Sequence, residues 1–266
     1  MLFNIKPLPP VKIPTVTFTG TKKDGIDGDN WEYAFLTSGT ITFDAPPGDC
    51  DIFLVANGKD GGPTSYQSSG IAEGYYYGGR GGDGGNYLVT RMTLEAGVAY
   101  TLTIGENTTL VGTGVNLSTA NGNAGADGGA RGSVRADTYN YNGNINAQPK
   151  AGKPGIYAYN DPSDTVLVPE FRGKTFCAGG GGGDGFYATA GLFPSENNDG
   201  GSNTGGDGSQ YRSTAPADTD KRRNASPGAE NSGSGGGGGR RSADGYDTNS
   251  AAGGTGVCFI RKHIGG

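Results

Sequence analysis

Few residues of this chain are suited to acid–base or nucleophilic chemistry. The only histidine of the 266 residues, His263, lies among the last four. A Ser-His-Asp or Cys-His arrangement needs a histidine held beside a nucleophile, and a closing tail is a poor place for one. We therefore expect no catalytic residues and a protein that is not an enzyme. Paired carboxylates for glycoside cleavage leave no mark in a sequence, so a depolymerase stays open as an alternative that no motif favours.

Metal and cofactor chemistry has equally little support. The three cysteines are far apart and form no Cys-x-x-Cys pair: Cys50, Cys177 and Cys258. This pattern argues against a zinc site or a disulfide framework and indicates small buried thiols. Asp24, Asp27 and Asp29 miss the spacing of an EF-hand loop, and Asp24-Gly25 and Asp27-Gly28 are typical of turns. We expect no metal and no cofactor.

The charge balance limits the class of partner. The chain has 21 basic and 26 acidic residues, a formal net charge of −5, and no long run of either sign. Such mild acidity disfavours a nucleic-acid partner, which would need a basic stripe. No segment approaches the ~18 apolar residues of a membrane span, and the N-terminal residues lack the apolar region of a signal peptide. The sequence predicts synthesis in a cytoplasm and no membrane insertion.

Recognition is the chemistry that the remaining residues favour. Aromatic and polar side chains gather in five segments, 63–77, 133–150, 186–199, 209–227 and 240–250. Tyrosine with Ser, Gly and Asn is typical of binding loops, because tyrosine presents rigid amphipathic area at a low entropy cost. The candidate binding residues are Tyr66, Tyr75, Tyr76, Tyr139, Tyr141, Phe186, Tyr187, Phe193, Tyr211, Arg222 and Tyr246.

Each of these residues has a structural alternative. A tyrosine next to a glycine run, such as Tyr75, Tyr76 or Tyr77 before Gly78, can instead pack over the backbone and shield its hydrogen bonds. The basic trio 221–223 could meet an anionic surface glycan or a phosphate, or it could be a solvated loop tip.

The elements that must position these segments are β-strands. Alternating or short apolar runs predict strands over 15–19, 31–35, 40–43, 51–55, 87–90, 98–104 and 257–260. Residues 45–49 form a predicted tight turn, and 95–97 join two of the strands. No segment keeps helical periodicity over three turns, so we expect no substantial α-helix.

Glycine is concentrated in the sequence segments between these predicted strands. The chain has 54 Gly and is only 33% hydrophobic, against about 45–50% in ordinary globular chains. Residues 78–86 read as three copies of Gly-Gly-Xaa, Gly122, Gly125 and Gly128 keep the same spacing, and residues 179–183 and 235–239 are unbroken glycine. The apolar content cannot fill a conventional core, so backbone must pack against backbone.

Glycine at every third position suits an extended helix with three residues per turn. Such a polyglycine II helix has a face without Cβ atoms, and neighbouring helices can then hydrogen-bond through their main chains. Residues 78–86 would span roughly 28 Å at that rise. A flexible Gly/Ser linker and an RGG-type RNA-binding segment are the alternatives. The recurrence of the runs weakens the first, and the isolated Arg80 and Arg131 weaken the second.

Several blocks in order resemble the glycine-rich tail proteins of phages and prophages. They include Trp31 with residues 37–43, residues 51–55 ahead of a glycine stretch, 94–105, 171–183 and 253–261. The resemblance covers roughly residues 15–132 and 171–262. The glycine-rich part also resembles, in architecture, the distal adhesins that cap the long tail fibres of T-even-like phages.

This resemblance implies an all-β and polyglycine II protein that binds a bacterial surface receptor, an outer protein or a glycan, through loops. It also implies other tail or fibre proteins as partners and a place in the virion, at a tail tip or fibre. A purely structural tail or capsid-decorating protein is the alternative. The expected layout is an extended arm at 1–14, a β-rich part at 15–57, a glycine-rich sandwich at 58–262 with strands at 87–104 and 257–260, and a tail at 263–266.

Overall fold

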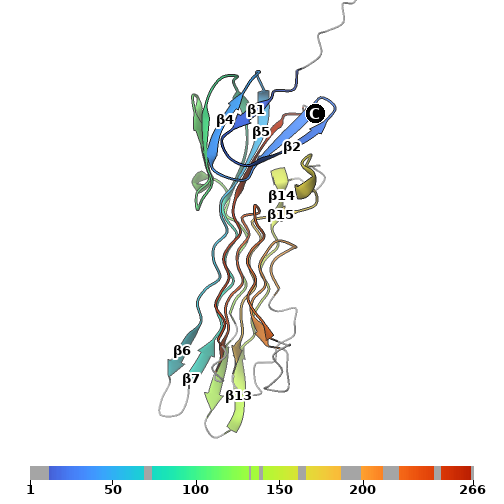
Figure 1. Ribbon diagram of the computed structural model, residues 1–266. Helices are drawn as coiled ribbons and strands as arrows, with labels where there is room; N and C mark the ends of the chain where they lie inside the picture. Colours follow the sequence, from blue (N-terminus) through green and yellow to red (C-terminus); the bar gives the residue numbers. More distant parts are fainter. Residues whose placement is uncertain are drawn as a thin grey trace, which may run out of the picture.

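A computed structural model describes residues 12–68, 74–131, 133–137, 140–160, 166–186, 199–211, 222–242 and 247–264. These residues form a β-rich head, a long shaft and a tip with short strands (Figure 1). They contain no α-helix, only the 3-10 turns η1 (Thr119–Asn121), η2 (Ala158–Asn160) and η3 (Pro169–Phe171). No helix of the described residues is long and apolar enough to cross a membrane. The all-β expectation is confirmed for this part of the chain.

The head contains two five-stranded sheets. The first has the order β1 (Val16–Phe18), β4 (Gly39–Phe43), β9 (Tyr100–Thr103), β10 (Thr109–Gly112) and β11 (Val115–Ser118). The second has the order β2 (Lys22–Asp27), β3 (Asn30–Phe35), β20 (Val257–Lys262), β5 (Gly48–Val55) and β8 (Tyr87–Leu94). Every neighbouring pair in both sheets is antiparallel. Each predicted strand matches one of these elements, and β2, β10 and β11 were not predicted.

The two sheets enclose the main hydrophobic core. Phe43 and Leu102 from the first sheet meet Trp31, Phe35 and Ile52 from the second, and all are nearly fully buried. The opposite face of the second sheet is also covered. There Phe53 and Phe259 pack against Phe171 and Phe176, so β5 and β20 are buried on both faces. Burial on both faces explains why these two strands are continuous apolar runs instead of alternating ones.

One predicted turn in the head is wrong. Asp24-Gly25 lies inside β2 and pairs with β3, whereas the turn between the two strands falls at Gly28, which has a φ of 59°. Gly25 serves a close approach instead of a turn. A Cβ at this position would lie 2.4 Å from the backbone carbon of Leu167, which crosses the outer face of β2.

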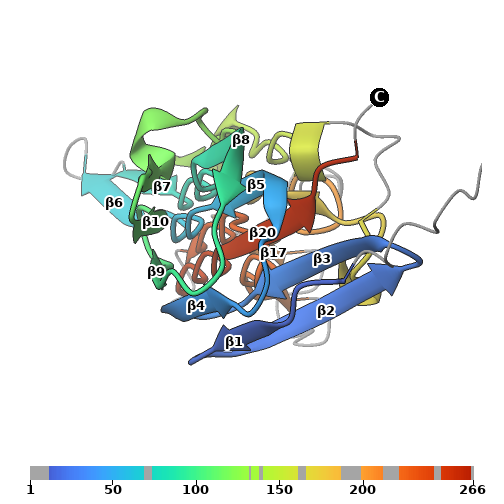
Figure 2. The ribbon, with the colours of Figure 1, turned by 90° about the horizontal axis from the view of Figure 1, so that it is seen from above.

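Extended glycine-rich segments form the shaft (Figure 1). They lie outside the named strands, at 56–62, 78–86, 124–131, 148–155, 177–184, 206–209, 224–229, 234–240 and 247–256. Seen from above, they appear end-on as coils behind the sheets of the head (Figure 2). Backbone hydrogen bonds of 2.6–3.3 Å join neighbouring segments.

The central segment 177–184 donates to three neighbours in rotation. The donor–acceptor pairs keep one order that repeats after three residues: Gly179–Lys153 (3.0 Å), Gly180–Gly82 (2.8 Å), Gly181–Gly206 (2.8 Å), Gly182–Lys150 (3.0 Å), Gly183–Gly79 (2.8 Å) and Asp184–Ser209 (3.2 Å). Each residue therefore turns by about a third of a circle relative to the one before it. Its glycines allow this close approach, because a Cβ at Gly180 or Gly183 would lie 2.1 or 2.0 Å from the carbonyl oxygen of a neighbouring segment.

Burial along the shaft follows the two glycine patterns of the sequence. In 78–86 the Gly-Gly pairs are buried, while Arg80 is exposed and Asp83 and Asn86 are partly exposed. In 179–183 and 235–239 every residue is buried. The Gly-Gly-Xaa repeat therefore marks a segment at the surface, and an unbroken glycine run marks a segment at the centre.

Candidate functional site

The tip of the shaft collects the predicted recognition segments. Short strands lie where these segments leave it: β6 (Ser65–Ser68), β7 (Gly74–Tyr77), β12 (Ser133–Asp137), β13 (Asn140–Ala147), β16 (Gly185–Phe186), β17 (Gln210–Tyr211), β18 (Arg222–Arg223) and β19 (Arg241–Ser242). The first four form one sheet in the order β13-β12-β7-β6. β16 pairs with β19 in parallel and also lies beside β7 and β12. Tyr75 and Tyr76, expected in a loop, therefore lie on a strand of this sheet.

Tyrosines on β6 and β7 divide between the two faces of the tip sheet. Tyr66 pairs across the strands with Tyr76, and their ring centroids lie 4.9 Å apart. Tyr66 also covers Gly74, where a Cβ would lie 2.4 Å from its ring, and it is still 47% exposed. On the other face Tyr75 and Tyr77 stack at 5.9 Å with an interplanar angle of 16°. Tyr66 thus packs over the backbone, as the structural alternative expected, and also keeps an exposed aromatic surface.

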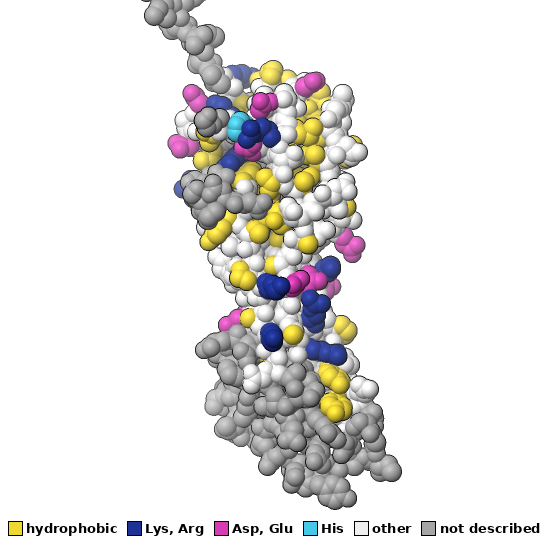
Figure 3. Space-filling view, turned by 180° about the vertical axis from the view of Figure 1, so that it is seen from behind, with side chains coloured by type: hydrophobic (Ala, Val, Ile, Leu, Met, Phe, Trp, Pro, Cys, Tyr) yellow, Lys and Arg dark blue, Asp and Glu magenta, His cyan; other side chains and the backbone are white. Residues whose placement is uncertain are grey.

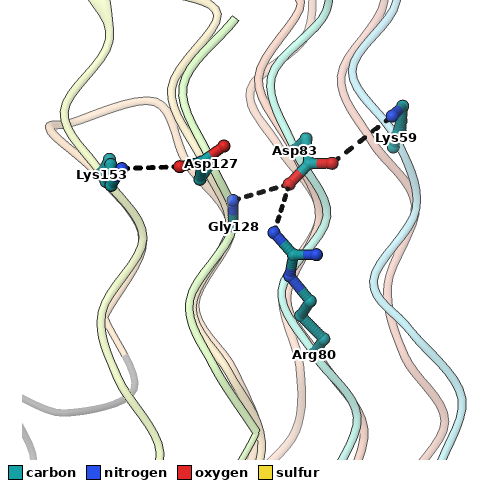
Figure 4. A network of polar contacts seen from close by, with 6 residues as sticks. All are labelled: Lys59, Arg80, Asp83, Asp127, Gly128 and Lys153. Atoms are coloured by element: carbon teal, nitrogen blue, oxygen red, sulfur yellow. Dashed lines mark hydrogen bonds and ion pairs between the residues drawn. The ribbon is translucent and has the colours of Figure 1, made fainter.

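A row of charged contacts crosses the shaft above this sheet (Figure 4). Asp83 accepts from Lys59 at 3.4 Å, from Arg80 at 3.0 Å and from the backbone amide of Gly128 at 2.9 Å. These contacts join three neighbouring segments. In the next pair of segments Lys153 binds Asp127 at 2.6 Å, and the Lys153 hydrogen bond, ahead of its charge, lowers the pKa of the Asp127 carboxyl.

A groove of about 810 Å³ opens on the same face of the shaft. Its basic lining residues are Arg80, Arg131, Lys150 and Lys153, and its one carboxylate is Asp127. Lys and Arg side chains gather along this part of the molecule in the space-filling view (Figure 3). Sequence reasoning missed the groove, since Arg80 and Arg131 are isolated in the chain. The three-residue spacing of Lys150 and Lys153 on one segment was the available signal.

Residues 36–263 match the family model described as a glycine-rich domain. The chain belongs to the glycine-rich domain family. No curated protein and no solved structure matches it. The family match includes the head strands from β4 onward as well as the shaft, while β1, β2 and β3 precede it.

For the other predicted site residues of this glycine-rich domain, the structure gives a backbone position at most. The backbone places four of them on strands at the tip: Tyr141 on β13, Phe186 on β16, Tyr211 on β17 and Arg222 on β18. The remaining four lie outside the described residues: Tyr139, Tyr187, Phe193 and Tyr246. Their role in binding stays a prediction.

The head of the glycine-rich domain contains its histidine, in a cluster around Asp51. The Asp51 carboxylate lies 3.0 Å from Nδ1 of His263, 3.0 Å from Nε of Arg91 and 3.7 Å from Nε of Arg261. Burial raises the pKa of Asp51, but the hydrogen bonds from His263 and Arg91 and the positive charges lower it further, so the pKa lies below its usual value. No group of three or more potential metal ligands occurs in the described part of the chain.

The cysteines are buried thiols, as the sequence indicated. Cys50, Cys177 and Cys258 are free and buried. Burial, ahead of the nearby charges of Asp51 and Asp49, raises the pKa of Cys50 to about 12, and burial also raises the pKa of the other two. Successive residues of a strand point to opposite faces, so Cys50 faces the core while Asp51 meets His263 on the other side. This geometry provides no thiolate–imidazole pair at β5.

Proposed function

We propose that this glycine-rich domain is a receptor-binding protein of a bacteriophage tail, which recognises the bacterial surface through its tip. The observation that carries the proposal is the separation of the two ends. The described chain begins and ends at the head, with Lys12 bound to Asp44 and His263 bound to Asp49, while the aromatic segments leave the shaft at the far end (Figure 1). A molecule attached by its head would present the tip outward. The resemblance of its sequence blocks to those of phage tail proteins supports the phage setting.

The shaft has the properties of a rigid spacer, and we propose that its segments are polyglycine II helices. Hydrogen bonds that repeat after three residues, with neighbours on all sides, support this assignment. Ordering glycine costs more backbone entropy than ordering any other residue. The dense backbone bonding offsets that cost and holds the tip at a fixed distance from the head.

The described part of the tip has features that suit binding. Exposed tyrosine on a rigid sheet loses little entropy when it meets a partner, and binding residues on loops and edges are best positioned by a rigid scaffold. The proposed role is therefore recognition, with a bacterial surface glycan or outer protein as the partner.

Substituting an exposed tip tyrosine tests this role. Tyr66→Ala should reduce binding of the fluorescently labelled protein to host cells by at least ~10-fold, which corresponds to about 1.4 kcal/mol. Tyr157→Ala is a matched control, since Tyr157 is 45% exposed but lies near the head on β14 (Ile156–Tyr157), paired with β15 (Thr175–Phe176). Thermal melting of both variants checks that the fold is kept. Equal cell binding by the two variants would contradict the tip as the recognition surface.

The position of the chain in the virion separates recognition from a purely structural role. Electron cryo-microscopy of the assembled particle should show the head against other tail proteins and the tip facing outward. A tip buried against neighbouring virion chains would instead assign the domain to the structural alternative.

A further inference from the structure

The groove on the shaft is positive although the whole chain is acidic. Four basic side chains and one carboxylate line it, while the chain as a whole has a net charge of −5. Asp127 binds Lys153, and Arg80 binds Asp83 just outside the lining. Within the part of the chain that the structure describes, no ion pair involves Arg131 or Lys150. Two cations thus face the groove without a carboxylate partner there.

Small residues make up much of the rest of the groove lining. Gly62, Gly128 and Gly129 contribute backbone, and Pro63 and Ala130 add small apolar groups. The segments that contribute this lining run along the shaft (Figure 1). A ligand that follows these segments would lie extended along the same axis.

Arg131, one of the lining residues, also contacts an aromatic stack at the tip. The Arg131 guanidinium lies over the Tyr77 ring, 4.4 Å from its centroid, and Tyr77 stacks on Tyr75. Stacking fixes the plane of the guanidinium and leaves its N–H edges available for two parallel bonds to a carboxylate or a phosphate. Tyr75 and Tyr77 are partly exposed beside this cation. Aromatic rings pack against the C–H groups of sugars, so a charged saccharide suits the cation and its aromatic neighbours.

We propose that this groove binds an acidic polysaccharide of the bacterial surface, whose carboxylate or phosphate groups meet Arg131 and Lys150. Lys150 and Lys153 are three residues apart on one segment, which is about 9 Å along the shaft. A repeating chain that meets Lys150 with one unit would therefore reach the Lys153–Asp127 pair with another. The inference rests on the proposed function and names the chemical class of its receptor.

The test compares neutral sugar polymers, charged sugar polymers and charged polymers without sugar. Full-length protein is titrated with dextran, carboxymethyl-dextran, dextran phosphate, polyglutamate and inorganic polyphosphate, with binding followed by biolayer interferometry. At least one charged dextran should bind at least ~10-fold more tightly than neutral dextran and than the sugar-free polyanion of the same charge type. Which charged dextran binds tells carboxylate from phosphate as the recognised group. Equal binding of the sugar-free polymers, or no binding at all, would overturn the inference.

Variants locate the site on the shaft. The double variant Arg131→Glu/Lys150→Glu should lose at least ~10-fold in affinity for the preferred dextran, because it reverses two charges at the groove. Lys23→Glu on β2 of the head makes the same type of change away from the groove and should keep wild-type affinity. Ala151→Trp blocks the groove without changing its charge and should also abolish binding. Undiminished binding by Ala151→Trp and by the double variant would place the ligand elsewhere.

Host-cell binding separates this inference from the proposed function. If both groove variants bind cells like wild type while Tyr66→Ala does not, the tip recognises the receptor and the groove inference is wrong. If the protein binds charged dextran through the groove but binds no host cell, the groove stands and the receptor-binding role fails.

Discussion

At Asp51, one carboxylate holds together the end of the chain and two strands of the head. His263 and Arg261 come from β20 and its C-terminal extension, and Arg91 comes from β8. The folded protein thus favours the ionised form of Asp51. The cluster joins residues 261–263 to the sandwich. It gives the only histidine of the sequence a structural role as a partner of Asp51.

The lowered pKa of Asp51 predicts a pH-dependent contribution to stability. A carboxyl with a folded-state pKa below its unfolded value, about 3.9, stabilises the fold fully above that value and loses this effect as the pH falls through the folded-state pKa. Asp51→Asn should lower the free energy of unfolding by about 1–3 kcal/mol at neutral pH. The difference from wild type should shrink below about pH 4. Urea titrations across this range measure it.

Asp29→Asn is the matched control for this measurement. Asp29 is an exposed aspartate in the turn between β2 and β3, so its substitution should change stability by less than about 0.5 kcal/mol. A wild-type advantage over Asp51→Asn that stays constant down to pH 2 would show that the charge of Asp51 does not act through these partners.

At the scale of the element, the two glycine patterns correspond to two environments. A segment at the surface of the shaft can tolerate one side chain in three, because one of its three faces meets solvent. A segment at the centre meets neighbours on all faces and tolerates none. The difference between 78–86 and 179–183 is therefore a difference in the number of bonded neighbours.

Adding one methyl group to a central segment should be disruptive. A Cβ at Gly180 would lie 2.1 Å from the carbonyl oxygen of Gly236, and that atom belongs to another backbone that cannot move alone. Gly180→Ala should cost at least about 1–3 kcal/mol, as overpacking does in tight cores. This loss lowers the Tm by roughly 2–4 °C per kcal/mol for a chain of this size class. Differential scanning calorimetry measures the shift.

Gly105→Ala provides the comparison, because the nearest heavy atom to a Cβ there is 4.0 Å away. Its Tm should stay close to that of wild type. Similar melting of Gly105→Ala and Gly180→Ala would mean that the central segments do not pack against each other as tightly as the structure indicates.

At the scale of the whole molecule, the shaft has to be as ordered as the head for the tip to be useful. The amides of 180–183 and 235–238 donate to neighbouring segments and are fully buried. Hydrogen–deuterium exchange should therefore find these glycines protected to an extent comparable with β5 and β20 in the head. Exchange as fast as in a free peptide of the same sequence would contradict the ordered, hydrogen-bonded packing of the shaft. The rigid presentation of the tip would then fail as well.

The sequence by itself determined many of the local conformations. Alternating runs predicted strands such as β1 and β4, and the apolar runs predicted β5 and β20, because side-chain periodicity follows burial. The three-residue glycine spacing predicted backbone packing for the same reason. Strands β10 and β11 were missed, although the Gly-Thr-Gly sequence at 112–114 between two alternating runs was a usable hairpin signal.

Only the tertiary structure decided which segments are neighbours. Every polyglycine face presents the same amides and carbonyls, so the run 179–183 contains nothing that selects residues 150–153 over any other segment. Which segments meet is therefore a property of the assembled fold. For the same reason Arg131 and Lys150, distant from Arg80 in the chain, form one groove only after the shaft has assembled.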